Sequence, residues 1–230
     1  MSAPTLRARV RAEMIEEIKS AARRHLAVDG ANLSLRAVAR DLGMVSSAVY
    51  RYFASRDDLL TALILDAYNS LGGAAEQAEA AVARADLTGR WLATCRGVRD
   101  WARANPHEYA LIYGSPVPGY AAPHDTVAPA SRVPLLLVAI LRHGHERGKL
   151  RTERGERIPR AVRATLTELR QQPGMGGLPD AVLARAVTAW VHLFGLVSFE
   201  LFGRFDGVID DVDAYFDYEM TTLARRSGLT

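Results

Sequence analysis

The sequence predicts an all-α protein with two parts, a small N-terminal helical domain at residues 1–55 and a larger helical domain at residues 56–230. Ala, Leu, Arg and Glu recur at helical spacing, and runs of alternating β-branched residues, which would indicate strands, are missing. Glycine and proline divide the chain into segments of helix length. About half of the 230 residues (49%) are apolar, so the chain can bury a substantial core.

The first predicted helix runs from about Leu6 to Val28. Its apolar face repeats at steps of four: Val10, Met14, Ile18, Ala22 and Leu26. Gly30 follows and can adopt the left-handed conformation that commonly ends a helix.

Two short helices are predicted next, at residues 35–42 and about 46–52. The Ser34 hydroxyl can cap the first of them by accepting an orphan backbone N–H, and Gly43 ends it. Ser55 can cap the helix that follows.

The rest of the chain is predicted to form longer helices, at about 56–83, 87–104, 105–113, 126–148, 180–202 and 212–226. Residues 114–123 hold three prolines and two glycines and predict a loop, and residues 172–179 form a second break. Between 148 and 172 lies a basic stretch: Lys149, Arg151, Arg154, Arg157, Arg160 and Arg163.

Residues 34–53, SLRAVARDLGMVSSAVYRYF, carry the strongest functional signal. Apolar residues predict a small core between the two short helices: Leu35, Val38, Ala39, Leu42 and Val49. Gly43 permits a tight turn with positive φ. Two short helices joined by such a turn are typical of a helix-turn-helix, whose second helix enters the major groove of DNA.

The second short helix carries side chains suited to that role. Ser46, Ser47 and Ala48 are short, so the helix can lie deep in the groove, where hydroxyls contact base edges and a methyl contacts thymine. Phosphate contacts are predicted for nearby residues that can donate hydrogen bonds: Ser34, Arg36, Tyr50, Arg51, Tyr52 and Arg56.

The charge distribution favours the same interpretation. Residues 1–60 contain ten Lys or Arg and seven Asp or Glu, whereas the remaining residues contain nineteen of each. The net charge of +3 therefore lies in the N-terminal quarter, as suits contact with a polyanion. Charge alone would equally describe solvated helix faces, and the two tyrosines could be core aromatics. The turn, the short residues and the charge together favour DNA binding.

Residues 10–68 resemble the N-terminal domain of the TetR family of repressors. The strongest match is AVYRYF at residues 48–53 followed by SRDDLL at residues 55–60. The resemblance implies base reading near Ser46 and Ser47, and phosphate contacts by Tyr50, Tyr52 and Arg56. Many members of the family have Ser or Thr at the position of Val45, as the cap of the recognition helix. We expect Ser46 to take that role here.

The C-terminal part resembles a subgroup of the family whose sensor domain carries a Trp-His-Gly signature. The similar stretches are WVHLFGLVSFELFG at residues 190–203 and PHEYALIYG at residues 106–114. The histidine of the subgroup falls on Phe194, so a role for that imidazole is lost here, and His192 is not assumed to replace it.

In this family the last two helices pair with their copies in a four-helix dimer interface. Both are apolar here, through Leu183, Val187, Trp190, Val191, Phe194, Val197 and Leu201 in one helix and Val212, Phe216, Met220 and Leu223 in the other. A homodimer on a palindromic operator is expected, because one short recognition helix reads few base pairs. The same stripes could instead form the core of a monomer.

The resemblance also implies that a small-molecule effector binds the larger domain. Candidates for its pocket are aromatic residues, several with a polar tip: Trp101, Tyr109, Tyr113, His145 and Trp190. Each could instead be an ordinary core or surface residue. The effector would favour a form whose recognition helices no longer match successive grooves, with the helix that begins at Arg56 as the lever. Repression is the expected outcome, and activation is the alternative.

Two other functions were weighed. An enzyme is disfavoured because no His-Glu-x-x-His, nucleophile elbow or phosphate loop is present, and because His143 and His145 would point about 200° apart on a helix. We therefore expect no catalytic residue, metal or cofactor. An architectural DNA-binding protein is the second alternative, and it would have no effector pocket and little sequence preference.

A cytoplasmic location without membrane contact is expected. The single cysteine, Cys95, excludes an internal disulfide. The longest uncharged stretch in the C-terminal half, residues 186–199, is shorter than the roughly 18 residues of a membrane span, and no secretory signal is visible.

Overall fold

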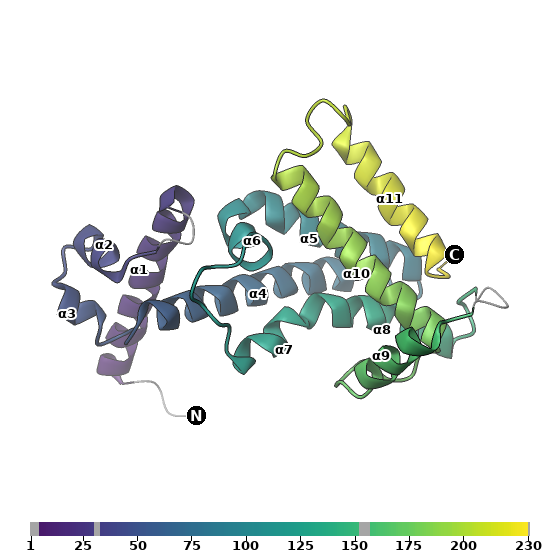
Figure 1. Ribbon diagram of the computed structural model, residues 1–230, viewed down its shortest axis with the longest axis horizontal. Helices are drawn as coiled ribbons and strands as arrows, with labels where there is room; N and C mark the ends of the chain where they lie inside the picture. The colour runs from purple at the N-terminus through teal and green to yellow at the C-terminus, as the bar shows by residue number, and fades with distance from the viewer. Residues whose placement is uncertain (1–4, 30–32, 152–156, 230) are drawn as a thin grey trace. The chain divides into compact units, whose positions relative to one another are not determined.

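The computed structural model describes residues 5–29, 33–151 and 157–229, and every regular element in those ranges is helical (Figure 1). The all-α prediction is confirmed. Gly30 and Arg154, named above, lie outside the described residues. The elements are α1 (Leu6–Asp29), α2 (Leu35–Asp41), α3 (Ser46–Val49), α4 (Arg56–Ala80), α5 (Leu87–Ala104), α6 (Pro106–Tyr113), the 3₁₀ turn η1 (His124–Thr126), α7 (Val127–Ala130), α8 (Arg132–Glu146), α9 (Arg160–Arg170), α10 (Asp180–Leu201) and α11 (Val212–Arg226).

The chain divides into two compact units. The first comprises Met1–Tyr68 and Asn105–Val127, and the second comprises Asn69–Ala104 and Ala128–Thr230. Helix α4 contributes residues to both units, and α6 joins the N-terminal helices although it lies far from them in the sequence. The first unit is therefore larger than the functional domain predicted at residues 1–55, and that functional boundary stays a prediction.

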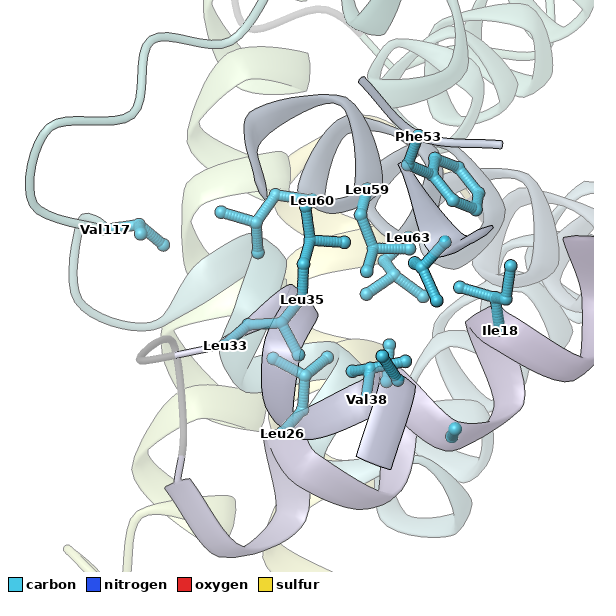
Figure 2. Close-up of a cluster of buried hydrophobic side chains, with 14 residues drawn as sticks. Ile18, Leu26, Leu33, Leu35, Val38, Phe53, Leu59, Leu60, Leu63 and Val117 are labelled. Carbon is cyan, nitrogen blue, oxygen red and sulfur yellow. The ribbon is translucent and has the colours of Figure 1, made fainter. Parts of the chain in front are cut away.

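One apolar core holds the first unit together (Figure 2). Ile18, Ala22 and Leu26 from the predicted stripe of α1 are buried in it, whereas Val10, at the beginning of the helix, is 51% exposed. Val117, from the loop after α6, belongs to the same core. The core therefore depends on a segment that no local pattern near the helix-turn-helix could have indicated.

Helix α2 has the predicted cap and stop. The Ser34 hydroxyl accepts a hydrogen bond from the Ala37 backbone N–H at 3.5 Å. Gly43 has a φ of +65°, in the left-handed region, and a Cβ built there would meet no atom within 4 Å. Backbone conformation rather than crowding therefore explains the glycine at this turn.

Helices α5, α8, α10 and α11 pack together in the second unit. Trp91 is fully buried on α5 and donates from Nε1 to the Met220 carbonyl of α11 at 3.2 Å. Phe216, Met220 and Leu223 are also buried within the chain. This stripe of α11 therefore serves the core of the chain itself, which was the alternative to a dimer interface for these residues.

Outside the helix-turn-helix, the structure differs from the sequence prediction at α7–α8 and at α9. The helix expected at 126–148 is broken at Ser131 into α7 and α8, with a bend of 44°. Pro134 lacks an N–H to donate to the residue 130 carbonyl, and proline is tolerated in the first turn of a new helix, so the break falls there. Helix α9 was not predicted, because only Leu166 of its residues is buried and its apolar pattern is thin.

Helix α10 is long and apolar enough to cross a membrane, with a mean hydropathy of 1.6 over 18 residues. In this fold it packs against α5, α8, α9 and α11. These contacts bury 39% of that window.

Candidate nucleic-acid interface

Buried apolar residues fix the turn between α2 and α3. Val38, Ala39 and Val49 are completely buried. The Met44 N–H donates to the Ala39 carbonyl at 2.9 Å, which closes the turn over these side chains. The inner face of the helix-turn-helix is thus anchored to the core of the first unit.

The opposite face of α3 lies in solvent. Ser47 is exposed, and Ser46 and Ala48 are partly exposed. These are the three short residues for which the sequence predicts base contacts. Had they packed inward, groove binding by α3 would have been impossible.

Helix α3 begins at Ser46, and Val45 occupies the N-cap position without a side-chain hydrogen bond. The expectation that Ser46 caps the helix is therefore wrong. Val45 has the extended conformation usual for a cap, with φ −70° and ψ 141°, so only the side-chain acceptor is missing.

Helix α3 is also shorter than predicted, because it ends at Val49 rather than near Tyr52. The Arg51 and Tyr52 N–H groups donate three residues back, to the Ala48 and Val49 carbonyls at 3.2 and 2.9 Å. Such bonds wind the chain more tightly than an α-helix. The three residues predicted to contact phosphate after α3 therefore lie in a turn: Tyr50, Arg51 and Tyr52.

These three side chains differ in exposure. Tyr50 is 46% exposed and Arg51 is exposed, so both can reach a ligand. Tyr52 is half-buried, and its ring packs against the core of the first unit. The two interpretations of the tyrosines, as phosphate ligands or as core aromatics, thus each apply in part. Tyr52 packs on the core with one side of its ring, whereas Tyr50 is exposed.

A surface hollow of about 470 Å³ gathers four of the predicted phosphate-binding residues. Its lining includes Ser34, Arg36, Tyr50 and Arg56, with Leu33, Leu35, Ala54 and Ser55. The beginnings of α2 and α4 both border it, and helix N-termini favour anions. The Ser34 and Ser55 hydroxyls already accept from one N–H of each helix, and Asp57 and Asp58 lie in the first turn of α4.

The basic residues at this surface fall into two kinds. Arg56 donates from Nε to the Leu33 carbonyl at 3.1 Å, which holds its side chain beside the hollow. Arg36, Arg40 and Arg51 are exposed, and in the described part of the chain none has a carboxylate within ion-pair distance. An anion that bound any of these three arginines would therefore not have to displace an acidic partner, whereas Arg56 has Asp57 at 3.6 Å.

The five residues predicted to line an effector pocket are divided between the two units. Tyr109 and Tyr113 lie in the first unit, with ring centroids 5.1 Å apart, and Tyr68 lies 6.0 Å from Tyr113. Burial, followed by the nearby Tyr68 and Tyr109, raises the pKa of Tyr113 well above its usual value. The Tyr113 hydroxyl therefore stays protonated and can donate a hydrogen bond. The sequence reading missed Tyr68, which no local motif marks.

The other three lie in the second unit. Trp101 is buried and donates from Nε1 to the Ser70 hydroxyl at 2.8 Å. His145 is exposed, and Trp190 is 38% exposed. Which of the five contact an effector stays a prediction.

No group of three potential metal ligands was found among the residues that the structure describes. His143, one of the histidines weighed as an acid–base group, lies between arginines, with Arg90 and Arg147 nitrogens 2.9 and 3.3 Å from its ring nitrogens. Burial raises the pKa of the Cys95 thiol, which favours its unreactive protonated form.

Comparison with known proteins decides the family. Residues 18–63 match the model of bacterial regulatory proteins of the tetR family, and residues 91–223 match the model of the tetracyclin repressor-like C-terminal domain. The chain belongs to the TetR family of transcriptional regulators. It is thus a DNA-binding regulator, in a family of regulators rather than enzymes, and the family resemblance of residues 10–68 is confirmed. The C-terminal match includes residues 190–203, which carried the resemblance to the Trp-His-Gly subgroup.

This chain is similar over most of its length to known mycobacterial transcriptional regulators. It is 39% identical over 215 residues to the HTH-type transcriptional regulator Rv1816 of Mycobacterium tuberculosis and to Mb1846 of Mycobacterium bovis. In each case the match covers 92% of this chain and 91% of the relative.

Solved structures agree with this assignment. The regulatory protein SCO4313 is 35% identical, with a TM-score of 0.76, and the match covers 95% of this chain and 98% of that one. The TetR-family regulator PfmR of Thermus thermophilus shares the fold at 19% identity, with a TM-score of 0.61 and coverage of 90% and 97%. RolR in complex with resorcinol shares it at 16% identity, with a TM-score of 0.53 and coverage of 96% and 94%.

Proposed function

We propose that this TetR-family regulator is a ligand-responsive repressor that binds a palindromic operator as a homodimer in the cytoplasm. The observation that carries the proposal is the exposed surface of α3 and the turn after it. Ser47, Tyr50 and Arg51 lie there in solvent, and the described residues offer Arg51 no carboxylate partner.

The surface divides into two chemical roles. The short side chains of α3 allow the helix to approach base edges closely, so Ser46, Ser47 and Ala48 would set the preferred sequence. The hollow beside them offers donors from four residues and two helix N-termini, which suits the phosphates that flank the groove. We assign the phosphate contacts to Ser34, Arg36, Tyr50, Arg51, Tyr52 and Arg56.

The exposed apolar residues of α10 and α11 support a homodimer. The α11 stripe belongs to the core, and so do Leu183, Phe194 and Val197 of α10. Other apolar side chains of these helices are exposed, and they include Trp190, Val191, Phe199 and Tyr218. Phe199 and Tyr218 are 54% and 60% exposed. A second copy that covered them would remove this surface from water and would present two recognition helices to one operator.

Two considerations support an effector. RolR, which shares the fold, binds resorcinol, a small aromatic ligand. The stacked tyrosines of α6 and the buried Trp101 offer comparable aromatic surface with hydrogen-bond donors. We propose a small, largely apolar effector contacted by residues among Trp101, Tyr109, Tyr113, His145 and Trp190.

DNA recognition is tested by selecting duplexes from a random-sequence library with the purified protein. Ser47→Ala is expected to change the selected base at one position of each half-site. Tyr50→Phe is expected to weaken binding to all sequences alike, because it removes a phosphate contact. Thr165→Ala, an exposed hydroxyl loss on α9, serves as the control and should change neither result. An architectural DNA-binding protein would instead select no sequence, and the proposal would then be abandoned.

The dimer is tested by Phe199→Glu, which places a charge on the proposed interface. Light scattering is expected to show a dimer for the wild-type protein and a monomer for this variant. Val208→Glu is the matched control, because Val208 is an exposed apolar residue in the loop between α10 and α11. A wild-type monomer, or a dimer that survives Phe199→Glu, would contradict the proposed interface.

The effector is tested by adding fractionated metabolite extracts to the complex of the protein with its selected duplex. We expect one fraction to release the duplex and to raise the Tm of the free protein. Release without any rise in Tm would indicate competition for the DNA instead.

A further inference from the structure

Arg11, on the second turn of α1, contacts the surface that we assign to DNA. Its guanidinium carbon lies 5.1 Å from the centre of the Tyr52 ring, and its Nη2 donates to the Arg51 carbonyl at 3.3 Å. Arg11 lies outside the helix-turn-helix motif, so sequence spacing gave no reason to connect it with Tyr52. The two contacts join the beginning of α1 to the turn that follows α3.

The contacts of Arg11 restrict the conformation of the Tyr52 side chain. One side of the ring packs on the core of the first unit, and the Arg11 guanidinium covers the ring as well. A ring held by packing and by a cation has fewer rotamers available, so the phenol oxygen is held in one place. The carbonyl that Arg11 also binds belongs to the residue just before Tyr52, so side chain and backbone are fixed together.

Arg11 itself is not engaged by an acid. In the described part of the chain no carboxylate lies within ion-pair distance of it, although α1 carries Glu13, Glu16 and Glu17. An exposed arginine on a surface helix usually contributes little to stability. Arg11 instead contacts two residues of the turn, Arg51 and Tyr52, so the arrangement favours a role at the interface.

We propose that Arg11 is a positioning residue for DNA recognition, which holds Tyr52 and the turn after α3 in the conformation that meets a backbone phosphate. This inference rests on the proposed function and deepens it. A positioning residue acts through its neighbour, so the effect of losing Arg11 should depend on whether Tyr52 is present. A direct phosphate contact would act through its own charge and would alter the salt dependence of binding.

The experiment measures affinity for the duplex selected by the wild-type protein, at several salt concentrations, for R11A, R11K, Y52A and R11A/Y52A. R9A is the matched control, because Arg9 is an exposed arginine of the same helix two residues away and its loss changes the net charge equally. Thermal unfolding of each variant shows whether the fold is retained.

R11A is expected to weaken binding about three- to tenfold, because it removes an exposed cation–π contact and weakens the hydrogen bond from Tyr52 to the phosphate. R9A is expected to weaken binding less than twofold. R11K should bind with an affinity between those of the wild type and R11A, because an ammonium keeps the charge and part of the cation–π attraction but lacks the planar guanidinium face. In the Y52A background the loss of Arg11 should cost less than twofold. For R11A, the slope of the logarithm of the affinity against the logarithm of the salt concentration should match the wild-type slope.

The inference is overturned if the salt slope of R11A falls by about one, or if the loss of Arg11 weakens binding as much in the Y52A background as in the wild type. The inference is also overturned if R11A and R9A bind the duplex with equal affinity while the wild type binds it tightly. The proposed function would still stand in that case. If the wild type selects no duplex, the proposed function fails together with this inference.

Discussion

Arginine is used differently at the α2–α3 surface of the first unit and in the second unit. In the second unit four guanidinium groups are matched with carboxylates: Arg90 with Glu79, Arg96 with Asp217, Arg99 with Glu200 and Asp213, and Arg132 with Glu76. At the α2–α3 surface Arg36, Arg40 and Arg51 are exposed and have no carboxylate within ion-pair distance in the described residues.

The contrast is local and does not extend to the whole first unit. Lys19 and Arg23 of α1 lie 2.8 and 2.7 Å from Asp66. Burial alone would lower the pKa of Lys19, but hydrogen bonds to Asp66 and Glu16 outweigh it and raise that pKa. Within the described residues, unpaired arginines also occur elsewhere, as at Arg204 and Arg226 of the second unit, so the feature of the α2–α3 surface is that three of them lie close together beside the recognition helix.

The largest expected effect is the loss of stability caused by Arg90→Met, which removes a buried ion pair of the second unit. Arg90 is 1% exposed, and its guanidinium contacts Glu79, which is itself buried. The substitution leaves the Glu79 carboxylate in the core without its closest partner. We expect the free energy of unfolding to fall by about 3–5 kcal/mol, measured by urea denaturation.

The control for that prediction is Arg96→Met. The Arg96–Asp217 pair has good geometry, with both contacts at 2.9 Å, but its side chains are about half exposed. Its loss should cost about 0.2–1 kcal/mol. Equal losses for the two variants would show that burial does not govern the value of these pairs.

A smaller effect, on binding rather than stability, is expected from Arg51→Ala. The selected duplex should bind roughly tenfold more weakly, as for one lost charge-assisted hydrogen bond of about 1.5 kcal/mol, and the salt slope should fall by about one. The free energy of unfolding should change by less than about 0.5 kcal/mol. A large loss of stability would break the contrast, because Arg51 would then resemble the paired arginines.

The smallest effect concerns the pH dependence of the second unit. Partial burial, followed by the positive charges of Arg90 and Arg147, lowers the pKa of His143 below 6.5. The unfolded chain then binds the proton more tightly than the folded chain does. The contribution of neutral His143 is therefore complete above about pH 6.5 and is lost as the pH falls through the lowered folded value.

We expect His143→Gln to flatten the decline of Tm below about pH 6.5. His145→Gln is the matched control, since His145 is exposed on the same helix, and it should leave the decline unchanged. If both variants behave like the wild type, proton binding at His143 does not contribute to acid unfolding.

Much of the fold and part of the site could be predicted from local sequence. The Ser34 cap and the Gly43 turn depend on neighbouring residues only, so the pattern identified both. The end of α3 could not be read in this way, because the 3₁₀-type bonds after Val49 leave no mark in an apolar pattern. Helix α9 was missed for a similar reason, since it buries a single residue.

Contacts between distant segments were also beyond local reasoning. Arg11 reaches Arg51 across forty residues of sequence, and Tyr68 of α4 meets Tyr113 of α6. The apolar stripe of α11 was visible, but the sequence could not decide whether it faces the chain or a second copy. The buried Phe216 and Met220 show that it faces the chain.

The place of Val117 in the core of the helix-turn-helix has a consequence for biosynthesis. The ribosome releases the N-terminus first, so α2 and α3 emerge well before the loop that supplies Val117. Until then the nascent domain exposes the apolar atoms that this side chain and the partly buried Leu111 later cover. The DNA-binding domain should therefore reach its final stability only after about half of the chain has been translated. Before that point, chaperones would bind its exposed apolar surface.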